Sequence, residues 1–137
     1  MNYLERIRKS GRDANPFFSL MGIEVSDIKE GFAQISMEIR QDMLNGEGWL
    51  QGGVFTALAD EAMVLAIYSL LEKNERIATV SEHTSFISGA REGALHAAGR
   101  VVKKGNRIIF AEGEVKYNEN GGKILSRTTA AFAVRKE

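Results

Sequence analysis

The sequence has no cysteine, a single proline and only two histidines among its 137 residues. The absence of cysteine excludes disulfide bonds, thiolate metal sites and a cysteine nucleophile. With His83 and His96 alone, a zinc site or a histidine-based triad has little to draw on. We therefore expect neither a metal nor a redox cofactor.

An excess of charge of either sign is also missing, because 18 Lys and Arg residues balance 18 Asp and Glu residues. Without a basic excess there is no electrostatic argument for a nucleic-acid partner. The first twelve residues are charged and hold no apolar stretch, which is untypical of a secretory signal, so we expect a cytoplasmic protein. Residues 54–71 are long enough to suggest a membrane span, but Asp60 and Glu61 in their first third argue against insertion.

The length and a hydrophobic content of 44% predict one domain, residues 1–137, with a substantial core. Helical spacing of apolar residues predicts a short and a long helix, and alternation or β-branched runs predict six strands. Asn15-Pro16 is expected to break the first helix, and Gly105-Asn106 to form a hairpin turn. The predicted helices cover residues 2–9 and 53–72, and the predicted strands cover 22–28, 33–39, 77–87, 94–103, 108–117 and 124–134.

The long predicted helix has few polar positions, so it must be buried on nearly every side. The strands around it are joined by short turns, which indicates antiparallel pairing. One curved antiparallel sheet wrapped around one helix satisfies both conditions, and its class is α+β. Such a sheet leaves an edge strand and one open side of the helix, so we expect a homo-oligomer, a dimer or a dimer of dimers.

The motif that suggests chemistry is the glycine-rich stretch 45–53, which leads directly into the long helix. Gly52 and Gly53 allow a reactive carbonyl to approach the bare N–H groups of the helix start. Asp60 lies two turns into an apolar helix, where burying a charge is costly without a function or a partner. Donors for an oxyanion beside a carboxylate are the parts of an acyl-transfer site.

With these residues, the sequence resembles the hotdog-fold acyl-CoA thioesterases, in the phenylacetate-degradation (PaaI-like) branch. The resemblance covers nearly the whole chain, and it depends on the order and spacing of several motifs more than on any one of them. The matching segments are Asn15-Pro16-Phe17-Phe18, Met21–Val25, Asn45, Gly48, Gly52-Gly53, Leu58–Ala62, Thr79, Phe86–Ala90 and Gly93.

The resemblance implies a role for each residue that matches the family pattern. Asp60 falls on the catalytic acid, which acts as nucleophile or as general base towards water. Gly52 falls on the glycine whose N–H polarises the thioester carbonyl, and Asn45 on a polar residue that helps to hold that carbonyl or the attacking water. Thr79 falls on a hydroxyl that positions water near the acid. In this branch the site lies between subunits, with Asn45 and Gly52 from one chain and Asp60 and Thr79 from the other.

The sequence departs from the family at Gln51, where a histidine usually precedes the two glycines. Glutamine can hydrogen-bond a substrate but cannot titrate, which puts any acid–base role of this position in doubt. We expect Gln51 and Gly53 to contact the substrate, with Glu61 as the alternative acid.

Structural interpretations remain open for several of these residues. The glycines are also suited to close helix–sheet packing, Asn45 to capping a turn, and Thr79 to a strand through its propensity alone. The basic cluster Arg100, Lys103, Lys104 and Arg107 is either a solvated hairpin tip or a rim for the phosphates of coenzyme A.

The function expected from these residues is hydrolysis of an acyl-CoA to the free acid and coenzyme A. Two alternatives remain at this stage. One is a non-catalytic acyl-CoA-binding module of the same fold, which the change at Gln51 keeps open. The other is an enoyl-CoA hydratase, although that chemistry wants an Asp and a His paired on one loop, and no such pair follows Asp60.

Overall fold

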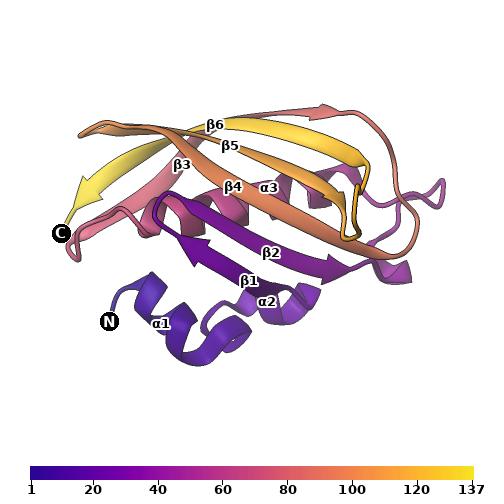
Figure 1. Ribbon diagram of the computed structural model, residues 1–137, viewed down its shortest axis with the longest axis horizontal. Coiled ribbons are helices and arrows are strands. Elements are labelled where there is room, and N and C mark those ends of the chain that lie inside the picture. Colours follow the sequence, from indigo (N-terminus) through magenta and orange to yellow (C-terminus); the bar gives the residue numbers. More distant parts are fainter.

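A computed structural model describes all 137 residues, as six strands in one antiparallel sheet and one long helix on its concave side, shown in Figure 1. The order of the strands across the sheet is β1-β2-β4-β5-β6-β3, which leaves β1 and β3 at the two edges. The strands are β1 (Glu24–Lys29), β2 (Phe32–Glu38), β3 (Glu75–Phe86), β4 (Ala94–Lys104), β5 (Ile108–Tyr117) and β6 (Ile124–Lys136). The helices are α1 (Tyr3–Ser10), α2 (Pro16–Met21) and α3 (Gly52–Tyr68), with 3-10 turns η1 (Gly11–Ala14) and η2 (Gln41–Met43).

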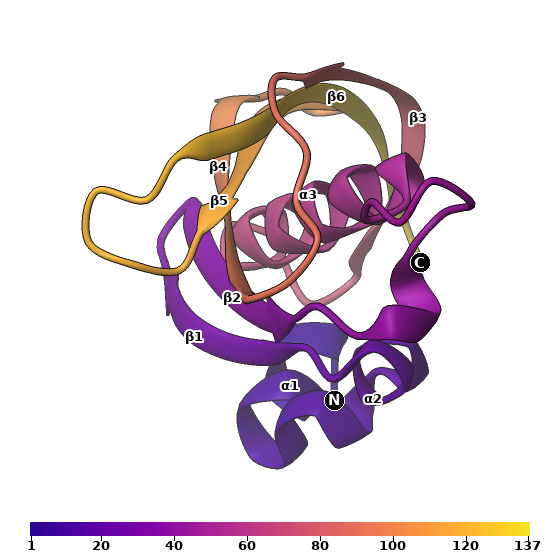
Figure 2. The same ribbon diagram turned by 90° about the vertical axis from the view of Figure 1, so that its right-hand side faces the viewer.

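Figure 2 looks along the molecule and shows the sheet curving around α3. The helix approaches the sheet closely at Gly99 of β4, where a Cβ atom would collide with the backbone of Ala62 and Met63. At Gly113 of β5 the same test atom would lie 3.2 Å from the Cβ of Ala59. These two glycines let the helix backbone lie directly on the sheet, so no layer of large side chains separates the helix from the sheet at these positions.

The predicted wrapping of one helix by one antiparallel sheet is confirmed. Alternation in β2 places Ala33, Ile35 and Met37 in the core. The long helix ends at Tyr68, four residues before the predicted end at Glu72. The Ser69 hydroxyl donates to the carbonyl of Ala66 at 2.6 Å and accepts from the N–H of Gly31 at 2.7 Å, so the last turn is tied to the β1–β2 loop.

The break predicted at Asn15-Pro16 is the start of a second helix, α2, which the sequence analysis did not predict. Asn15 caps it, because its side-chain oxygen accepts from the N–H groups of Phe17 and Phe18. Proline is well suited to the first helical position, where its missing N–H has no partner to lose. Phe18 then becomes fully buried, and α1 and α2 lie together beside β1, at the bottom of Figure 2.

The predicted hairpin turn at Gly105-Asn106 is three residues long, because β5 begins only at Ile108. The N–H of Gly105 closes it by donating to the carbonyl of Ile108 at 3.0 Å.

None of the helices has the length and apolar composition needed to cross a bilayer.

Candidate active site

Helix α3 begins with backbone N–H groups that no part of the chain uses. Gln51 is its N-cap, but the Gln51 side chain makes no capping hydrogen bond. The N–H groups of Gly52 and Gly53 donate to no acceptor within the chain, whereas that of Val54 donates to the Gln51 carbonyl. Because free N–H groups at a helix start attract negative charge, this end of α3 can bind an anion or a developing oxyanion.

The two glycines differ in what surrounds them. A Cβ on Gly52 would lie 3.4 Å from the ring of Phe86, so this position is partly covered by the end of β3. A Cβ on Gly53 would meet nothing within 4 Å, and neither glycine has the positive φ that demands glycine. Close helix–sheet packing within one chain therefore does not account for Gly53.

Asn45 organises the loop before the helix. Its side-chain oxygen accepts from the N–H groups of Glu47 and Trp49, at 3.0 and 3.1 Å, which is the turn-capping role considered from the sequence. The side-chain NH₂ group of Asn45 has no partner within the chain and is exposed. Asn45 thus combines a structural acceptor with a free donor.

Asp60 lies on the open side of α3, facing the inner surface of the edge strand β3. The hydroxyl of Thr79 donates to the Oδ1 atom of Asp60 at 3.2 Å. Thr79 faces inward because it pairs with Phe132 of β6, whose side chain is fully buried. The structure therefore brings together two of the residues that the sequence singled out, although they are 19 positions apart.

Glu82 is a third polar residue at this place, and the sequence analysis did not identify it. In a regular strand Thr79 and Glu82 would point to opposite faces, because they are three positions apart. A β-bulge between Thr79 and Ser81 inserts one extra residue, so Thr79 pairs with Phe132 and Glu82 pairs with Ala130. Both side chains therefore face Asp60, and a bulge of this kind leaves no period-2 signal in the sequence.

The two glutamates nearest to Asp60 favour their neutral forms. Burial raises the pKa of Glu82 to about 8, and a hydrogen bond with Asp60 and the charge of Asp60 add to this effect. Burial also raises the pKa of Glu61 to about 7, together with the charge of Asp60 and against a hydrogen bond from Asn15. Glu61 points toward the N-terminal segment, where the amide of Asn15 donates to it at 3.4 Å and to Tyr3 at 2.7 Å. Asp60 raises the pKa of both glutamates, but only Glu61 accepts a hydrogen bond from another part of the chain, the amide of Asn15.

Gln51 lines an apolar hollow of about 420 Å³ beside the helix start. The other lining residues come from α2, from η2 and its flanks, and from the first turn of α3: Leu20, Met21, Arg40, Asp42, Met43, Leu44 and Val54. Trp49 precedes Gln51 by two residues and contacts the loop after β3. The guanidinium of Arg91 lies 3.8 Å from the Trp49 ring centroid, and a Cβ atom on Gly89 would lie 2.9 Å from the same ring. Trp49 therefore packs against Arg91 and Gly89.

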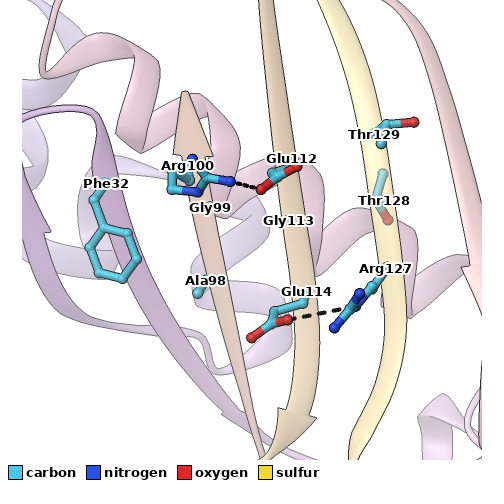
Figure 3. A pocket seen from close by; sticks show the side chains of 10 residues that line it. All are labelled: Phe32, Ala98, Gly99, Arg100, Glu112, Gly113, Glu114, Arg127, Thr128 and Thr129. Carbon is cyan, nitrogen blue, oxygen red and sulfur yellow. Dashed lines mark hydrogen bonds and ion pairs between the residues drawn. The ribbon is translucent and has the colours of Figure 1, made fainter. Parts of the chain in front are cut away.

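A wider depression, of about 480 Å³, lies on the outer face of the sheet and is shown in Figure 3. Its charged side chains pair with one another across strands, Arg100 with Glu112 and Arg127 with Glu114. Arg100, one of the basic residues considered for phosphate binding, therefore has an acidic partner within the chain. Few of the lining residues are apolar, and the depression holds none of the expected site residues.

Comparison with known proteins agrees with this fold. The sequence model of the thioesterase superfamily matches residues 47–124, which include the helix start, Asp60, Thr79 and Glu82. A protein of Halobacterium salinarum whose name assigns it as an esterase is 31% identical over 73% of this chain and 69% of its own length. The 1,4-dihydroxy-2-naphthoyl-CoA hydrolase of Listeria monocytogenes is 22% identical over 85% of this chain and 94% of its own length.

Among solved structures, a phenylacetic acid degradation-related protein of Ralstonia eutropha superposes with a TM-score of 0.86 at 22% identity, covering 96% of this chain and 99% of its own. A likeness at this identity establishes the hotdog fold, and the match to the superfamily covers more than half of the chain. The chain belongs to the thioesterase superfamily and is a hotdog-fold thioester hydrolase.

Proposed function

We propose that this protein hydrolyses an acyl-CoA thioester to the free acid and coenzyme A, with Asp60 as the catalytic acid and the Gly52 N–H as the oxyanion donor. The observation that carries the proposal is the Asp60 carboxylate, held by the Thr79 hydroxyl on the open side of the same helix whose start offers unused N–H groups. The name of the Listeria relative, a hydrolase of a CoA thioester, supports the substrate class.

The chemistry follows from these groups in one of two ways. As a general base, Asp60 takes a proton from water while the water oxygen attacks the thioester carbonyl. As a nucleophile, Asp60 attacks the carbonyl itself and forms an anhydride, which water then hydrolyses. In both routes the oxyanion accepts from the Gly52 N–H, and the C–S bond breaks to release the coenzyme A thiolate, which takes up a proton. The hydroxyl of Thr79 fixes the orientation of Asp60.

Helix geometry argues that the two groups serving one carbonyl come from different chains. Gly52 and Asp60 are eight residues apart, which is about 12 Å along the axis of an α-helix. An oxyanion donor and an attacking group must each lie within about 3–3.5 Å of the same carbonyl group. One helix cannot meet both conditions, whereas two antiparallel helices related by a two-fold axis can bring Gly52 of one chain beside Asp60 of the partner subunit.

The apolar hollow beside Gln51 is suited to the acyl group of the substrate. Its lining is mainly apolar side chains, and it includes Gln51 and Val54, which flank the two glycines at the helix start. An acyl chain or ring seated there would leave its carbonyl near the helix start. Gln51 at the edge of the hollow offers a neutral hydrogen-bonding group in place of an imidazole.

A panel of short, long and aryl acyl-CoAs, assayed for release of free thiol, tests the proposal. The Asp60→Asn variant should keep its fold, because Asn is nearly isosteric with Asp, and should lose about 10²–10⁴ or more in rate because it can act neither as base nor as nucleophile. Glu61→Gln is the matched control on the neighbouring position. A folded Asp60→Asn protein with activity within about threefold of wild type would assign the chemistry to another acid. Loss of the enoyl double bond without thiol release would indicate a hydratase instead.

A further inference from the structure

Glu82 faces Asp60 from the inner surface of β3, and no other group explains its position. The Oε1 atom of Glu82 is buried and has no hydrogen-bond partner among the donors of the chain. A carboxylate oxygen shielded from water without a donor is costly. The same oxygen is satisfied if it carries a proton and itself acts as the donor.

The surroundings of Glu82 offer no cation that would stabilise its charge. Helix α3 presents Asp60 to it, and Glu61 on the same helix is bonded to Asn15 instead. Strand β6 presents Ala130 directly opposite. His83, the next residue of β3, is exposed on the other face of the strand. Two carboxyl groups that face each other with no cation between them are most stable when they share one proton.

We propose that Glu82 is a positioning residue for Asp60: at neutral pH it holds the proton of the pair and donates it in a hydrogen bond to the Asp60 carboxylate. Asp60 then receives two donors, the hydroxyl of Thr79 and the protonated carboxyl of Glu82. The pair fixes the Asp60 carboxylate in one orientation, which either catalytic route requires. This inference rests on the proposed role of Asp60 as the catalytic acid.

The arrangement predicts a loss of activity at alkaline pH. Burial, together with the hydrogen bond and charge of Asp60, raises the pKa of Glu82 to about 8. Above that pH, Glu82 loses its proton, so Asp60 loses a donor and gains a like charge beside it. The carboxylate of Asp60 is then free to turn away from Thr79, and kcat falls.

The test is the pH profile of kcat for Glu82→Gln and Glu82→Leu. Gln keeps a neutral N–H donor of similar reach, so Glu82→Gln should show no alkaline fall in kcat. At neutral pH its kcat should be lower by no more than about threefold, which is less than the loss expected when one hydrogen bond is removed. Leu has no donor, so Glu82→Leu should lower kcat by about tenfold, the loss expected for one hydrogen bond to a charged group. Glu61→Gln is the control, and it should keep the alkaline fall. An alkaline fall that survives in Glu82→Gln would overturn the proposal.

An activity-independent measurement separates this inference from the proposed function. Infrared difference spectra of the carboxyl C=O stretch, recorded across pH, should show a protonated carboxyl that titrates near pH 8 in wild type, besides that of Glu61 near pH 7. The signal near pH 8 should be missing in Glu82→Gln and kept in Glu61→Gln. In Asp60→Asn the like charge is gone, so the same group should titrate at lower pH. Absence of this signal in wild type overturns the inference even if the protein is active. Its presence in a protein that hydrolyses none of the acyl-CoAs upholds the proton-sharing pair and overturns the proposed function.

Discussion

Gln51 is exposed at the cap of α3, and its side chain is free to meet a substrate. Gln51→His should be tolerated by the fold, because both side chains offer hydrogen bonds of similar reach. If Gln51 performs the role of the family's usual histidine less effectively, the change should raise the rate for at least one class of acyl-CoA. If it matches a different acyl group, the order of preferred substrates should change. Unaltered rates and order across the panel would show that the position is incidental.

Glu61 gives the clearest pH dependence of stability. Its pKa is raised to about 7 in the folded protein, mainly by burial, so the folded state binds more protons than the unfolded state between about pH 4.5 and 7. Stability conferred by the neutral form is therefore lost as the pH rises through that window. Glu61→Gln keeps an acceptor for Asn15 without a titratable group, so it should be more stable than wild type at pH 8, by about 1–3 kcal/mol, and nearly equal at pH 4.

Urea unfolding of wild type and Glu61→Gln at pH 4 and pH 8 measures this difference. Glu119→Gln, in the exposed turn between β5 and β6, is the control for removing one negative charge from the molecule. A gain of equal size at both pH values would contradict the assignment, because it would not depend on the ionisation of Glu61.

At the scale of the element, a substitution of Gly53 at the start of α3 separates a packing role of this glycine from a functional role. A methyl group at Gly53 meets nothing, so Gly53→Ala should stabilise the helix by up to about 0.5–1 kcal/mol. The same methyl would stand where the thioester or the partner chain approaches, so kcat should fall. Thermal unfolding and steady-state kinetics give the two values, and light scattering shows whether association has changed. A more stable Gly53→Ala enzyme with full activity would leave the glycine without a role in the site.

At the scale of the whole molecule, β3 is an edge strand with apolar side chains open to solvent. Val80 and Phe86 of β3, and Ile87 directly after it, are 61%, 58% and 56% exposed in the single chain. An unpaired edge of this length with exposed apolar residues favours pairing with a second copy, which would also cover the open side of α3. We therefore expect at least a dimer. A monomer mass by light scattering at micromolar concentration would contradict both the oligomer and the shared site.

Cross-subunit complementation tests which residues come from which chain. Asn45→Asp keeps the side-chain oxygen that caps the loop, removes the free NH₂ donor and places a negative charge near the proposed oxyanion, so it is a better inactive parent than a truncation. Mixing it with Asp60→Asn after reversible dissociation gives mixed dimers with one doubly defective site and one intact site. With random pairing, roughly a quarter of wild-type activity should return, by the symmetry of a two-fold interface.

The experiment requires that each parent is nearly inactive alone and that the subunits are shown to exchange. If both conditions hold and no activity returns, Asn45 and Asp60 of one site belong to the same chain. That result would refute the shared site without removing Asp60 as the catalytic acid.

Much of this protein can be predicted from the sequence because the signals are local. The alternation of Ala33, Ile35 and Met37 indicates which face of β2 is buried, and the apolar run after Gly53 indicates a helix that must be enclosed. Because the later strands are joined by short turns, they pair antiparallel. A sheet of this kind around the helix buries both the apolar face of the strands and the helix. The position of Asp60 in an apolar helix after two glycines also predicts the region of the candidate site.

The tertiary structure alone decided which polar groups meet at Asp60. Sequence periodicity assigns faces by counting residues, and the bulge after Thr79 changes that count, so Glu82 turns inward only once β3 has paired with β6. Likewise, Asn15 follows one helical segment and caps the next, and the second helix forms because Phe18 is buried in the core. Local patterns determine the elements of this fold, whereas the pairing of strands far apart in the sequence determines which side chains share a proton beside the site.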